Sequence, residues 1–247
     1  MIAGVDGARG GWVVALADDW PSPTPPTLHL APDFAAVVAL TKQCAAVALD
    51  MPIGLPCGSD VRACDMCARS ELARRSPQDI KAPSRLFMVP PREAICASHG
   101  DPAEFQRLHR LHRGVGAGLP VWGIVPKIIE VDDALGTDPS LQERIVEFHP
   151  ELAFAHLAGE VLPSKHTAAG AMRRLATLCD HIPDVARLAV PPNFSPVMLD
   201  DVLDALVGLS TAAHLATVAD RSHPQSRRLP HDAVPTDSRG LRMEIWF

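Results

Sequence analysis

Two short apolar segments of this chain each end in an aspartate that is followed at once by a turn. The first runs through residues 2–5 to Asp6 and enters the glycine-rich "DGARGG", and the second runs through 45–49 to Asp50 and enters "MPIGLP". Short apolar runs bounded by turn residues are typical of buried strands. Because an ionised carboxylate is costly to bury alone, we expect the fold to supply partners or a metal ion for both aspartates.

The rest of the chain alternates strand-like and helix-like segments around these two strands. Strands are predicted over 12–17, 27–31, 144–148 and 241–247, and helices over 32–44, 167–182 and 195–219. The last helix has the strongest pattern, since Val202, Leu203, Leu206 and Leu209 recur at helical spacing. Three antiparallel strands, followed by strands that alternate with helices, predict an α/β fold with a mixed sheet and helices on its faces.

Composition narrows the class of protein. With 247 residues, 47% of them hydrophobic, the chain can bury the core of one domain spanning 1–247. No apolar run approaches the ~20 residues of a membrane helix, and the N-terminus lacks the features of a secretory signal, so a soluble, cytoplasmic protein is expected. The six cysteines are scattered; Cys64 and Cys67 form a C-x-x-C without the further ligands of a zinc site, which favours reduced thiols.

Charge is unevenly distributed along the chain. The net charge of −6 argues against a surface that attracts nucleic acid everywhere. Residues 57–116 nevertheless carry ten Lys and Arg against seven Asp and Glu, within a segment of about 57–140 that reads as a mostly helical insertion. Arg107, Arg110 and Arg113 are three residues apart and share a helix face, which fits either a solvated surface or contacts with phosphates. We expect this insertion to form one wall of the active cleft.

Further carboxylates are placed to join Asp6 and Asp50. The long helix carries Asp200, Asp201 and Asp204, of which Asp201 and Asp204 share a face, and Glu147 lies on a neighbouring strand. Each aspartate taken alone fits a turn or a helix cap equally well. Together, at the carboxyl ends of strands where open sheets build their sites, they predict a site for Mg²⁺ or Mn²⁺, because a divalent cation relieves their repulsion.

Several motifs resemble the domain-of-unknown-function family 429. They are "GVDGARGGW", "ALDMPIGLP", "RACDMCAR", "PKIIEVDDAL", "EFHPELAF", "SKHT", "LDDVLDAL" and "GLRMEIWF", and the resemblance runs from about Ile2 to Phe247. That family is described as predicted nucleases with a ribonuclease H-like fold, so the resemblance implies this fold and this activity here. RuvC-like resolvases of this broader fold carry an aspartate on strand 1, an acid on strand 4 and two aspartates three residues apart on the last helix. Asp6, Asp50, Asp201 and Asp204 match this pattern, although resolvases have Glu in the place of Asp50 and lack the 57–140 insertion.

The expected activity is metal-dependent hydrolysis of a phosphodiester in a nucleic acid. Two divalent ions ~4 Å apart would activate water and stabilise the leaving oxygen. The expected catalytic metal ligands are Asp6, Asp50, Asp201 and Asp204, and Glu147 is expected to be a further catalytic carboxylate. The groups expected to bind phosphates are Lys127, Lys165, Arg107, Arg110 and Arg113. His149, which alternates with Glu147 and Glu151, fits a packed histidine and a site residue equally well, and Glu130 and Asp132 fit supporting or capping roles.

Two other classes of function compete with the nuclease. An actin-like, kinase-type phosphotransferase also ends its first strand in D-x-G, but it needs two such domains, and no second D-x-G box is present. A non-catalytic nucleic-acid-binding or regulatory module could retain the fold without turnover. The sequence leaves open whether the substrate is DNA, RNA or a small phosphodiester, and whether the protein is a homodimer.

Overall fold

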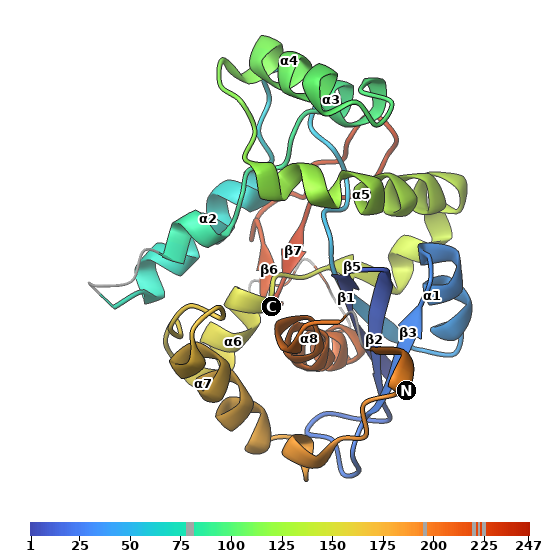
Figure 1. Ribbon diagram of the computed structural model, residues 1–247, viewed down its shortest axis with the longest axis vertical. Helices are drawn as coiled ribbons and strands as arrows, with labels where there is room; N and C mark the ends of the chain where they lie inside the picture. The colour runs from blue at the N-terminus through green and yellow to red at the C-terminus, as the bar shows by residue number, and fades with distance from the viewer. Residues whose placement is uncertain (78–81, 195–196, 219–220, 222, 224–225) are drawn as a thin grey trace.

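The two strands that end in aspartate lie side by side at the centre of a five-stranded sheet (Figure 1). The structure is a computed structural model that describes residues 1–77, 82–194, 197–218, 221, 223 and 226–247. The sheet contains β1 (Ile2–Ala8), β2 (Gly11–Ala17), β3 (Thr27–Ala31), β4 (Ala46–Asp50) and β5 (Ile145–Glu147), in the order β3-β2-β1-β4-β5. β2 is antiparallel to both β1 and β3, whereas β4 is parallel to both β1 and β5. The sheet is therefore mixed, as expected, and the predicted adjacency of the strands of Asp6 and Asp50 is confirmed.

Helices account for most of the remaining regular structure. The α-helices are α1 (Phe34–Leu40), α2 (Ala63–Arg75), α3 (Arg92–Ala97), α4 (Pro102–Arg113), α5 (Leu119–Thr137), α6 (Pro150–Ala158), α7 (Ala168–Cys179) and α8 (Leu199–Thr217). Short 3₁₀ turns occur over Ala82–Arg85, Pro139–Glu143, Val185–Arg187 and Pro192–Phe194. Two further strands, β6 (Arg228–Leu229) and β7 (Ile245–Trp246), pair with each other.

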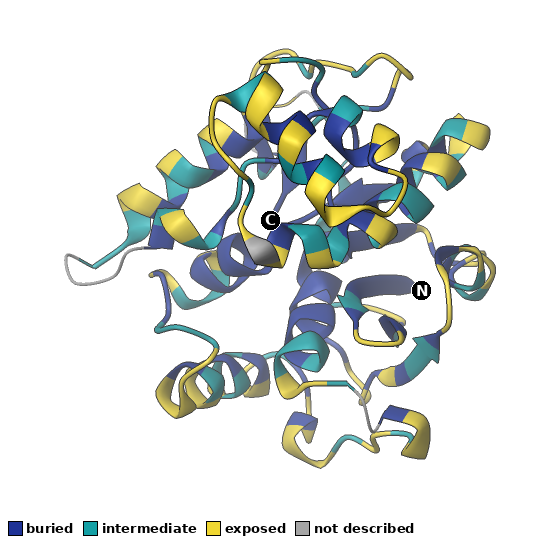
Figure 2. Cartoon of the chain, turned by 45° about the horizontal axis from the view of Figure 1, so that its top comes forward, coloured by how far each residue is buried: buried dark blue, intermediate teal, exposed yellow. Residues whose placement is uncertain are grey.

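The helices cover both faces of the sheet, because successive strand residues alternate between two cores. Val13 and Ala15 pack with residues of α6, α7 and α8, while Val5 and Val14 pack with residues of α1, α3, α4 and α5. In Figure 2 the sheet and the central helix are dark blue, and the outer helices alternate between buried and exposed residues. Every residue of α8 from Leu203 to Ala212 is buried, so α8 is a core helix rather than a surface one.

Two glycines allow α8 to approach β1 closely. A Cβ at Gly4 would collide with the carbonyl oxygen of Ala205 in α8, and a Cβ at Gly208 would lie 3.0 Å from the Cα of Gly4. The two backbones are therefore in direct contact at this point. Gly4 lies two residues before Asp6 on the same face of β1, and Gly208 lies one helical turn after Asp204. This contact brings Asp204 to the end of β1.

The strand expected over 144–148 is shorter in the structure, and the period-two spacing of Glu147, His149 and Glu151 does not continue along it. β5 ends at Glu147, and α6 begins at Pro150 with His149 as its N-cap residue. Proline is well suited to the first position of a helix, which explains the change of direction. Glu147, His149 and Glu151 therefore do not alternate along one strand face, and Glu151 lies in the first turn of a helix that the sequence pattern did not predict.

The expected last strand, 241–247, also takes a different place. Only Ile245 and Trp246 are in strand conformation, and they pair with β6 in the small second sheet rather than with the five-stranded sheet. A single parallel bridge between Phe148 and Trp246 joins the two. The ends of the helix expected over 195–219, at residues 195–196 and 219, lie outside the described residues.

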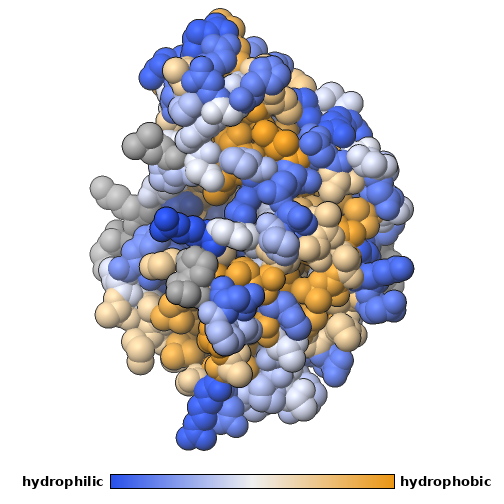
Figure 3. Space-filling model, turned by 45° about the vertical axis from the view of Figure 1, so that its right-hand side comes forward, coloured by the Kyte–Doolittle hydropathy of each residue, from blue (hydrophilic) through white to orange (hydrophobic). Residues whose placement is uncertain are grey.

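The segment expected to be an insertion is mostly helical where the structure describes it. It contains α2 to α5, and residues 78–81 within it lie outside the described part. α3 and α4 form the narrow upper end of the molecule in Figure 1, on the far side of α5 from α8. On the face in Figure 3, hydrophilic and apolar side chains are interspersed below this end.

Candidate active site

The side chains of Asp6 and Asp50 lie next to each other at the carboxyl end of the sheet. The two residues are register partners in the parallel ladder between β1 and β4, whose strands are about 4.8 Å apart. Both lie on the sheet face that α8 covers, since Ile2 and Ala8 of β1 and Ala48 of β4 pack with α8. Asp6 is buried and Asp50 is half-buried.

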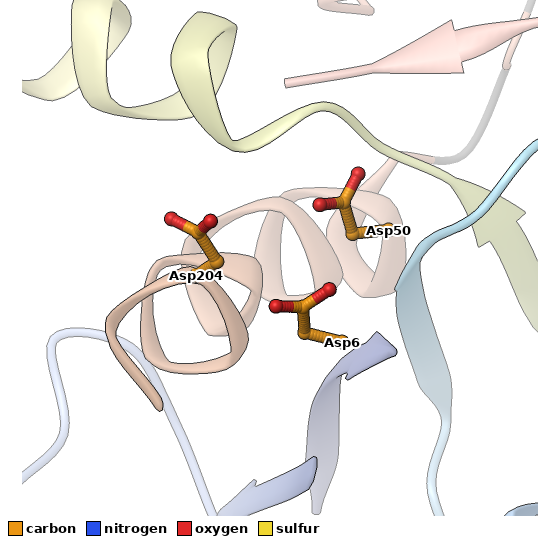
Figure 4. A group of neighbouring side chains, drawn as sticks. All are labelled: Asp6, Asp50 and Asp204. Carbon is orange, nitrogen blue, oxygen red and sulfur yellow. The ribbon is translucent and has the colours of Figure 1, made fainter. Parts of the chain in front are cut away.

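Asp204 of α8 completes an acidic triad with these two residues. One carboxylate oxygen from each of Asp6, Asp50 and Asp204 lies within 4.8 Å of the other two. Figure 4 shows the three carboxylates converging from two strand ends and one helix on a common space. Asp204 is 1% exposed, its Oδ2 accepts a hydrogen bond from Lys165, and its buried Oδ1 has no hydrogen-bond partner among the described residues.

Burial and mutual repulsion raise the pKa values of the triad. Burial raises the pKa of Asp6 well above its usual value, and Asp50 and Asp204 raise it further. The pKa of Asp50 is raised in the same way, by burial and then by Asp204. Burial raises the pKa of Asp204 to about 6, even though the Lys165 ammonium opposes the shift. Without another cation, the triad therefore retains protons at pH values where isolated aspartates are ionised.

Lys165 is the counter-ion of the triad. It lies in the segment between α6 and α7, with its Nζ 2.6 Å from Asp204 Oδ2 and 3.4 Å from Asp200 Oδ2. Burial lowers the pKa of Lys165, but Asp204, Asp6 and Asp50 outweigh it and raise the pKa above its usual value. One ammonium among three carboxylates leaves negative charge at the site. The contact expected between Lys165 and a substrate phosphate stays a prediction.

Asp201 lies outside the triad, although it was expected to share the site with Asp204. Its Oδ2 accepts a hydrogen bond from the backbone N–H of Met198, 3.1 Å away, and so caps the N-terminus of α8. Burial raises its pKa. An aspartate at the third position of a helix can reach back to the cap residue, which explains this placement. The expected set of four carboxylates is a set of three in this structure, with Asp201 beside it.

Glu147 is engaged by a buried arginine that the sequence did not single out. Arg62 donates from Nη2 to Glu147 Oε1 at 2.6 Å and from Nη1 to Glu147 Oε2 at 2.8 Å, and the backbone N–H of Ile53 donates to Oε2 at 2.8 Å. Arg62 also pairs with Asp65. Burial raises the pKa of Glu147 to about 7, with Arg62 opposing the shift. Both oxygens of Glu147 are already bonded, so its geometry fits a structural role better than direct catalysis. The i, i+3 spacing of Arg62 and Asp65 was the available signal.

Lys127 reaches the turn that follows Asp6. Its Nζ donates to the carbonyl of Gly11 at 2.6 Å and lies 4.6 Å from the centre of the Trp12 ring. Its stem passes over Gly7, where a Cβ would lie 2.8 Å from the Lys127 Cδ. Burial lowers its pKa. The residue thus lies at the edge of the site, and its contact with a phosphate is still a prediction.

The two other acidic residues of α5 have structural partners. Glu130 accepts hydrogen bonds from the Trp12 indole at 3.1 Å and from the backbone N–H of Phe34 at 2.8 Å, which joins α5 to β2 and α1. Asp132 forms ion pairs with Arg92 and Arg239. The supporting role considered for both therefore fits their contacts.

The three arginines of α4 lie away from the triad. Arg107 is exposed and pairs with Glu104 at 2.7 Å. Arg113 donates to the carbonyls of Ser59 and Val89, and burial lowers its pKa. Arg110 is exposed. A role for this surface in binding nucleic acid stays a prediction.

A cavity of about 270 Å³ adjoins the triad. Asp50, Asp204 and Lys165 belong to its lining, as does His149, whose buried Nδ1 has no hydrogen-bond partner in the described part of the chain. Burial lowers the pKa of His149 to about 4, so its ring is neutral at physiological pH. The lining also includes residues that the sequence did not single out for the site: Met51, Pro52, Asp65, Arg85, Leu86, Phe87, Val89, Phe148, Pro150, Ser164, His166 and Ile245. Asp65, Arg85, Leu86, Phe87 and Val89 thus bring part of the 57–140 segment into the wall of this cavity.

The cysteines take no part in the site. All six are free, and neither Cys64 nor Cys67 lines the cavity. Cys64 is fully buried, and burial raises the pKa of its thiol. A thiol with a raised pKa is a poor nucleophile and a poor metal ligand at neutral pH.

The triad is chemically suited to a hard divalent cation. Carboxylate oxygens are the ligands that Mg²⁺ and Mn²⁺ prefer, and a buried carboxylate oxygen without a partner is costly unless something binds it. Asp204 Oδ1 is such an atom, and the raised pKa values of the triad have the same origin. Asp6, Asp50 and Asp204 therefore fit a bound metal ion.

Comparison with known proteins identifies the family. In the described part of the chain, no helix is long and apolar enough to cross a membrane. Neither the curated proteins nor the solved structures contain a match to this chain. A family model, described as "Protein of unknown function (DUF429)", matches residues 4–229. This match covers most of the sequence, and the chain therefore belongs to the DUF429 family.

Proposed function

We propose that the protein is a metal-dependent nuclease that hydrolyses phosphodiester bonds of a nucleic acid. The observation that carries the proposal is the acidic triad, with one oxygen of each carboxylate within 4.8 Å of the others and Asp204 Oδ1 buried without a partner among the described residues. Buried carboxylates that do not bind metal are usually matched by cations, as Glu151 is by Arg85 and Arg174. The triad has three carboxylates and, among the described residues, the ammonium of Lys165 as its ion-pair partner.

The topology supports a ribonuclease H-like arrangement as part of this proposal. The sheet order β3-β2-β1-β4-β5 places the three antiparallel strands first and the parallel strands after them. The carboxylates come from the first strand, the fourth strand and the last long helix, as the resemblance to RuvC-like resolvases implies. The free thiols of all six cysteines support a cytoplasmic location.

In this proposal, Asp6, Asp50 and Asp204 would hold Mg²⁺ or Mn²⁺ beside the cavity, whose lining includes Asp50 and Asp204. The bound metal would supply an activated water molecule and stabilise the leaving oxygen. Lys165, whose Nζ is 2.6 Å from Asp204, keeps that carboxylate ionised and in place. The neighbouring Arg62–Glu147 pair fixes the start of the loop after β4, since the backbone of Ile53 donates to Glu147.

Cleavage of labelled single-stranded and duplex DNA and RNA with millimolar Mn²⁺ tests the proposal. Asp6→Asn keeps the side-chain shape but removes a charge, so we expect cleavage to fall at least about 100-fold, as for other groups that act directly on the transition state. Asp18→Asn, at an exposed position after β2, is the matched control and should cleave like the wild type. Cleavage that persists in Asp6→Asn, or that needs no divalent ion, would contradict the proposal.

Binding of the nucleic acid by α4 has its own test. Replacing Arg107, Arg110 and Arg113 together by Gln should weaken binding and reduce the salt dependence by about 0.9 in slope for each phosphate that is no longer neutralised, because fewer counterions are released. Affinity is measured by fluorescence anisotropy over a series of salt concentrations. An unchanged slope would show that these arginines form only a solvated helix face.

The Lys165 contact also favours one competing function, a non-catalytic module of the same fold. An ammonium on Asp204 partly neutralises the triad without any metal. If the triad is neutralised by Lys165 and binds no metal, Asp6→Ala should raise the melting temperature and leave Mn²⁺ binding unchanged. Loss of Mn²⁺ binding in Asp6→Ala would remove this alternative.

A further inference from the structure

The cavity beside the triad has a wall whose charged groups are already paired with one another. Glu147 and Asp65 are bonded to Arg62, and Glu151 accepts hydrogen bonds from Arg85 and Arg174. Asp65 also accepts from the backbone N–H of Val89 at 3.1 Å. These residues hold the wall in shape and leave little capacity to bind a ligand ion. The cavity is therefore pre-formed, as small-molecule sites usually are.

Two buried polar atoms of the lining remain without a partner among the described residues. They are Asp204 Oδ1, at the triad, and His149 Nδ1, at the start of α6. Asp204 is 1% exposed. Because buried polar atoms in folded proteins are nearly always hydrogen-bonded, each of these two atoms has capacity for a further hydrogen bond or ion contact. The imidazole of His149 is neutral and can therefore donate or accept a hydrogen bond.

The rest of the lining is largely apolar. Met51, Leu86, Phe87, Val89, Phe148 and Ile245 contribute to it. Phe87 is half-buried, so part of its side chain is accessible. A lining with apolar and aromatic residues, a few polar atoms and one charged edge fits a nucleotide, whose base is flat and apolar on its faces and polar on its edge.

The size of the cavity limits what can enter. Its volume of about 270 Å³ lies just below the range of about 300–1,000 Å³ that is typical of small-molecule sites. A base that is stacked and paired in a duplex cannot enter such a space. A base that has left the stack can, and enzymes that act on a single nucleotide hold extruded bases in pockets of this kind.

We propose that this cavity binds one unpaired nucleotide of the substrate, with its base among the apolar residues and its phosphate at the triad. Phe87 offers a surface for stacking, and His149 contributes its ring to the same lining. The position of the phosphate rests on the function proposed above, whereas binding of the base does not require a metal. The substrate is thus a single-stranded, terminal or extruded nucleotide rather than a continuous duplex.

Uncharged nucleosides test the cavity without the metal. Adenosine and 2′-deoxyadenosine are titrated in EDTA against the wild type, Ser164→Trp and Ser70→Trp, with binding followed by ligand-observed NMR. Ser164 lines the cavity, so a tryptophan there should fill it and weaken binding at least tenfold; Ser70 lies on the exposed face of α2, so its variant should bind like the wild type. The ratio of the two affinities then shows whether the cavity prefers ribose or deoxyribose.

A second variant guards against misfolding of Ser164→Trp. Phe87→Ala removes the stacking surface from a half-buried position and should weaken nucleoside binding at least threefold, with an unchanged circular dichroism spectrum. The inference is overturned if nucleosides show no saturable binding to the wild type, or if the folded cavity variants bind them as the wild type does.

A further binding experiment distinguishes failure of this inference from failure of the proposed function. The affinity for adenosine 5′-monophosphate is compared in EDTA and in Mn²⁺, where we expect at least a tenfold gain because the metal joins the phosphate to the triad. Nucleoside binding without any effect of Mn²⁺ would overturn the metal site and leave the cavity standing. A Mn²⁺ effect that Ser164→Trp and Phe87→Ala do not alter would overturn the cavity and leave the metal site standing.

Discussion

Replacing Asp6 by Asn should stabilise the metal-free protein and destabilise it relative to the wild type when metal is present. Two unit charges 4.8 Å apart repel each other by about 3 kcal/mol at an effective dielectric constant of about 20. Asp6→Asn removes the repulsion that involves Asp6, so a gain of about 2–3 kcal/mol is expected in EDTA at pH 8.

For a protein of this size, such a gain raises the melting temperature by about 4–12 °C. The size of this gain depends on pH. A carboxyl group with a raised pKa binds more protons in the folded state than in the unfolded state between its two pKa values, so stability falls as the pH rises through that window. At pH 5 the triad retains protons and the repulsion is weaker, and the gain from Asp6→Asn should therefore be smaller than at pH 8.

Saturating Mn²⁺ should reverse the order of the two proteins. A ligand at 1,000 times its dissociation constant stabilises the folded state by about 4.1 kcal/mol, which exceeds the gain expected for Asp6→Asn in EDTA, and Asp6→Asn should lose most of this metal stabilisation together with its charge. Differential scanning fluorimetry in EDTA and in Mn²⁺ measures both effects, with Asp18→Asn as the control. A melting temperature of Asp6→Asn at or below that of the wild type in EDTA would refute the repulsion, and the absence of any Mn²⁺ shift in the wild type would refute the metal site.

Three further predictions concern the framework of the site. Gly4→Ala should destabilise the protein by about 1–3 kcal/mol in thermal melts, because the added Cβ meets the backbone of α8. Gly123→Ala is the control: no atom lies within 4 Å of its added Cβ, so it should be neutral or stabilising. Arg62→Met should cost about 3–5 kcal/mol in urea unfolding because two buried carboxylates lose their partner. Arg74→Met, at an exposed ion pair, should cost far less, and equal effects of the two changes would contradict the buried network. The pKa of His149 is about 6.5 in the unfolded chain and about 4 in the folded protein, so the free energy of unfolding should fall as the pH drops through this window. His149→Gln should reduce this fall, measured by urea unfolding between pH 7 and pH 4.5, by about 2 kcal/mol. An unaltered pH dependence would contradict a buried neutral ring.

The roles of Lys165 and Asp201 show where reasoning from residue spacing reaches its limit. Asp201 and Asp204 do share a helix face, but Asp201 is one turn closer to the start of α8 and bonds the backbone of Met198 instead. Lys165 is far from the triad in sequence and supplies part of the positive charge that a metal would otherwise provide. Any metal that binds the triad must compete with this ammonium for Asp204.

Local pattern was enough to determine much of the main sheet and part of the site. The apolar runs that end at Asp6 and Asp50 predict two buried strands. β3 runs in the direction of β1, because β2 is antiparallel to both, and α1 returns the chain so that β4 runs in the same direction. The periodicity around Leu203 and Leu206 likewise predicts the long helix that carries Asp204. These features depend on neighbouring residues only, which is why the sequence contains them.

Only the tertiary structure decided which groups meet. The contact between Gly4 and Gly208 sets the depth at which α8 lies on β1, and so brings Asp204 rather than Asp201 to the triad. The pairing of Arg62 with Glu147 joins residues 85 positions apart, and the cavity likewise forms between the insertion and α6. Sequence periodicity describes the face of one element at a time, whereas a site depends on how several elements pack, and that packing is fixed by close contacts between backbones and by buried charges that need partners.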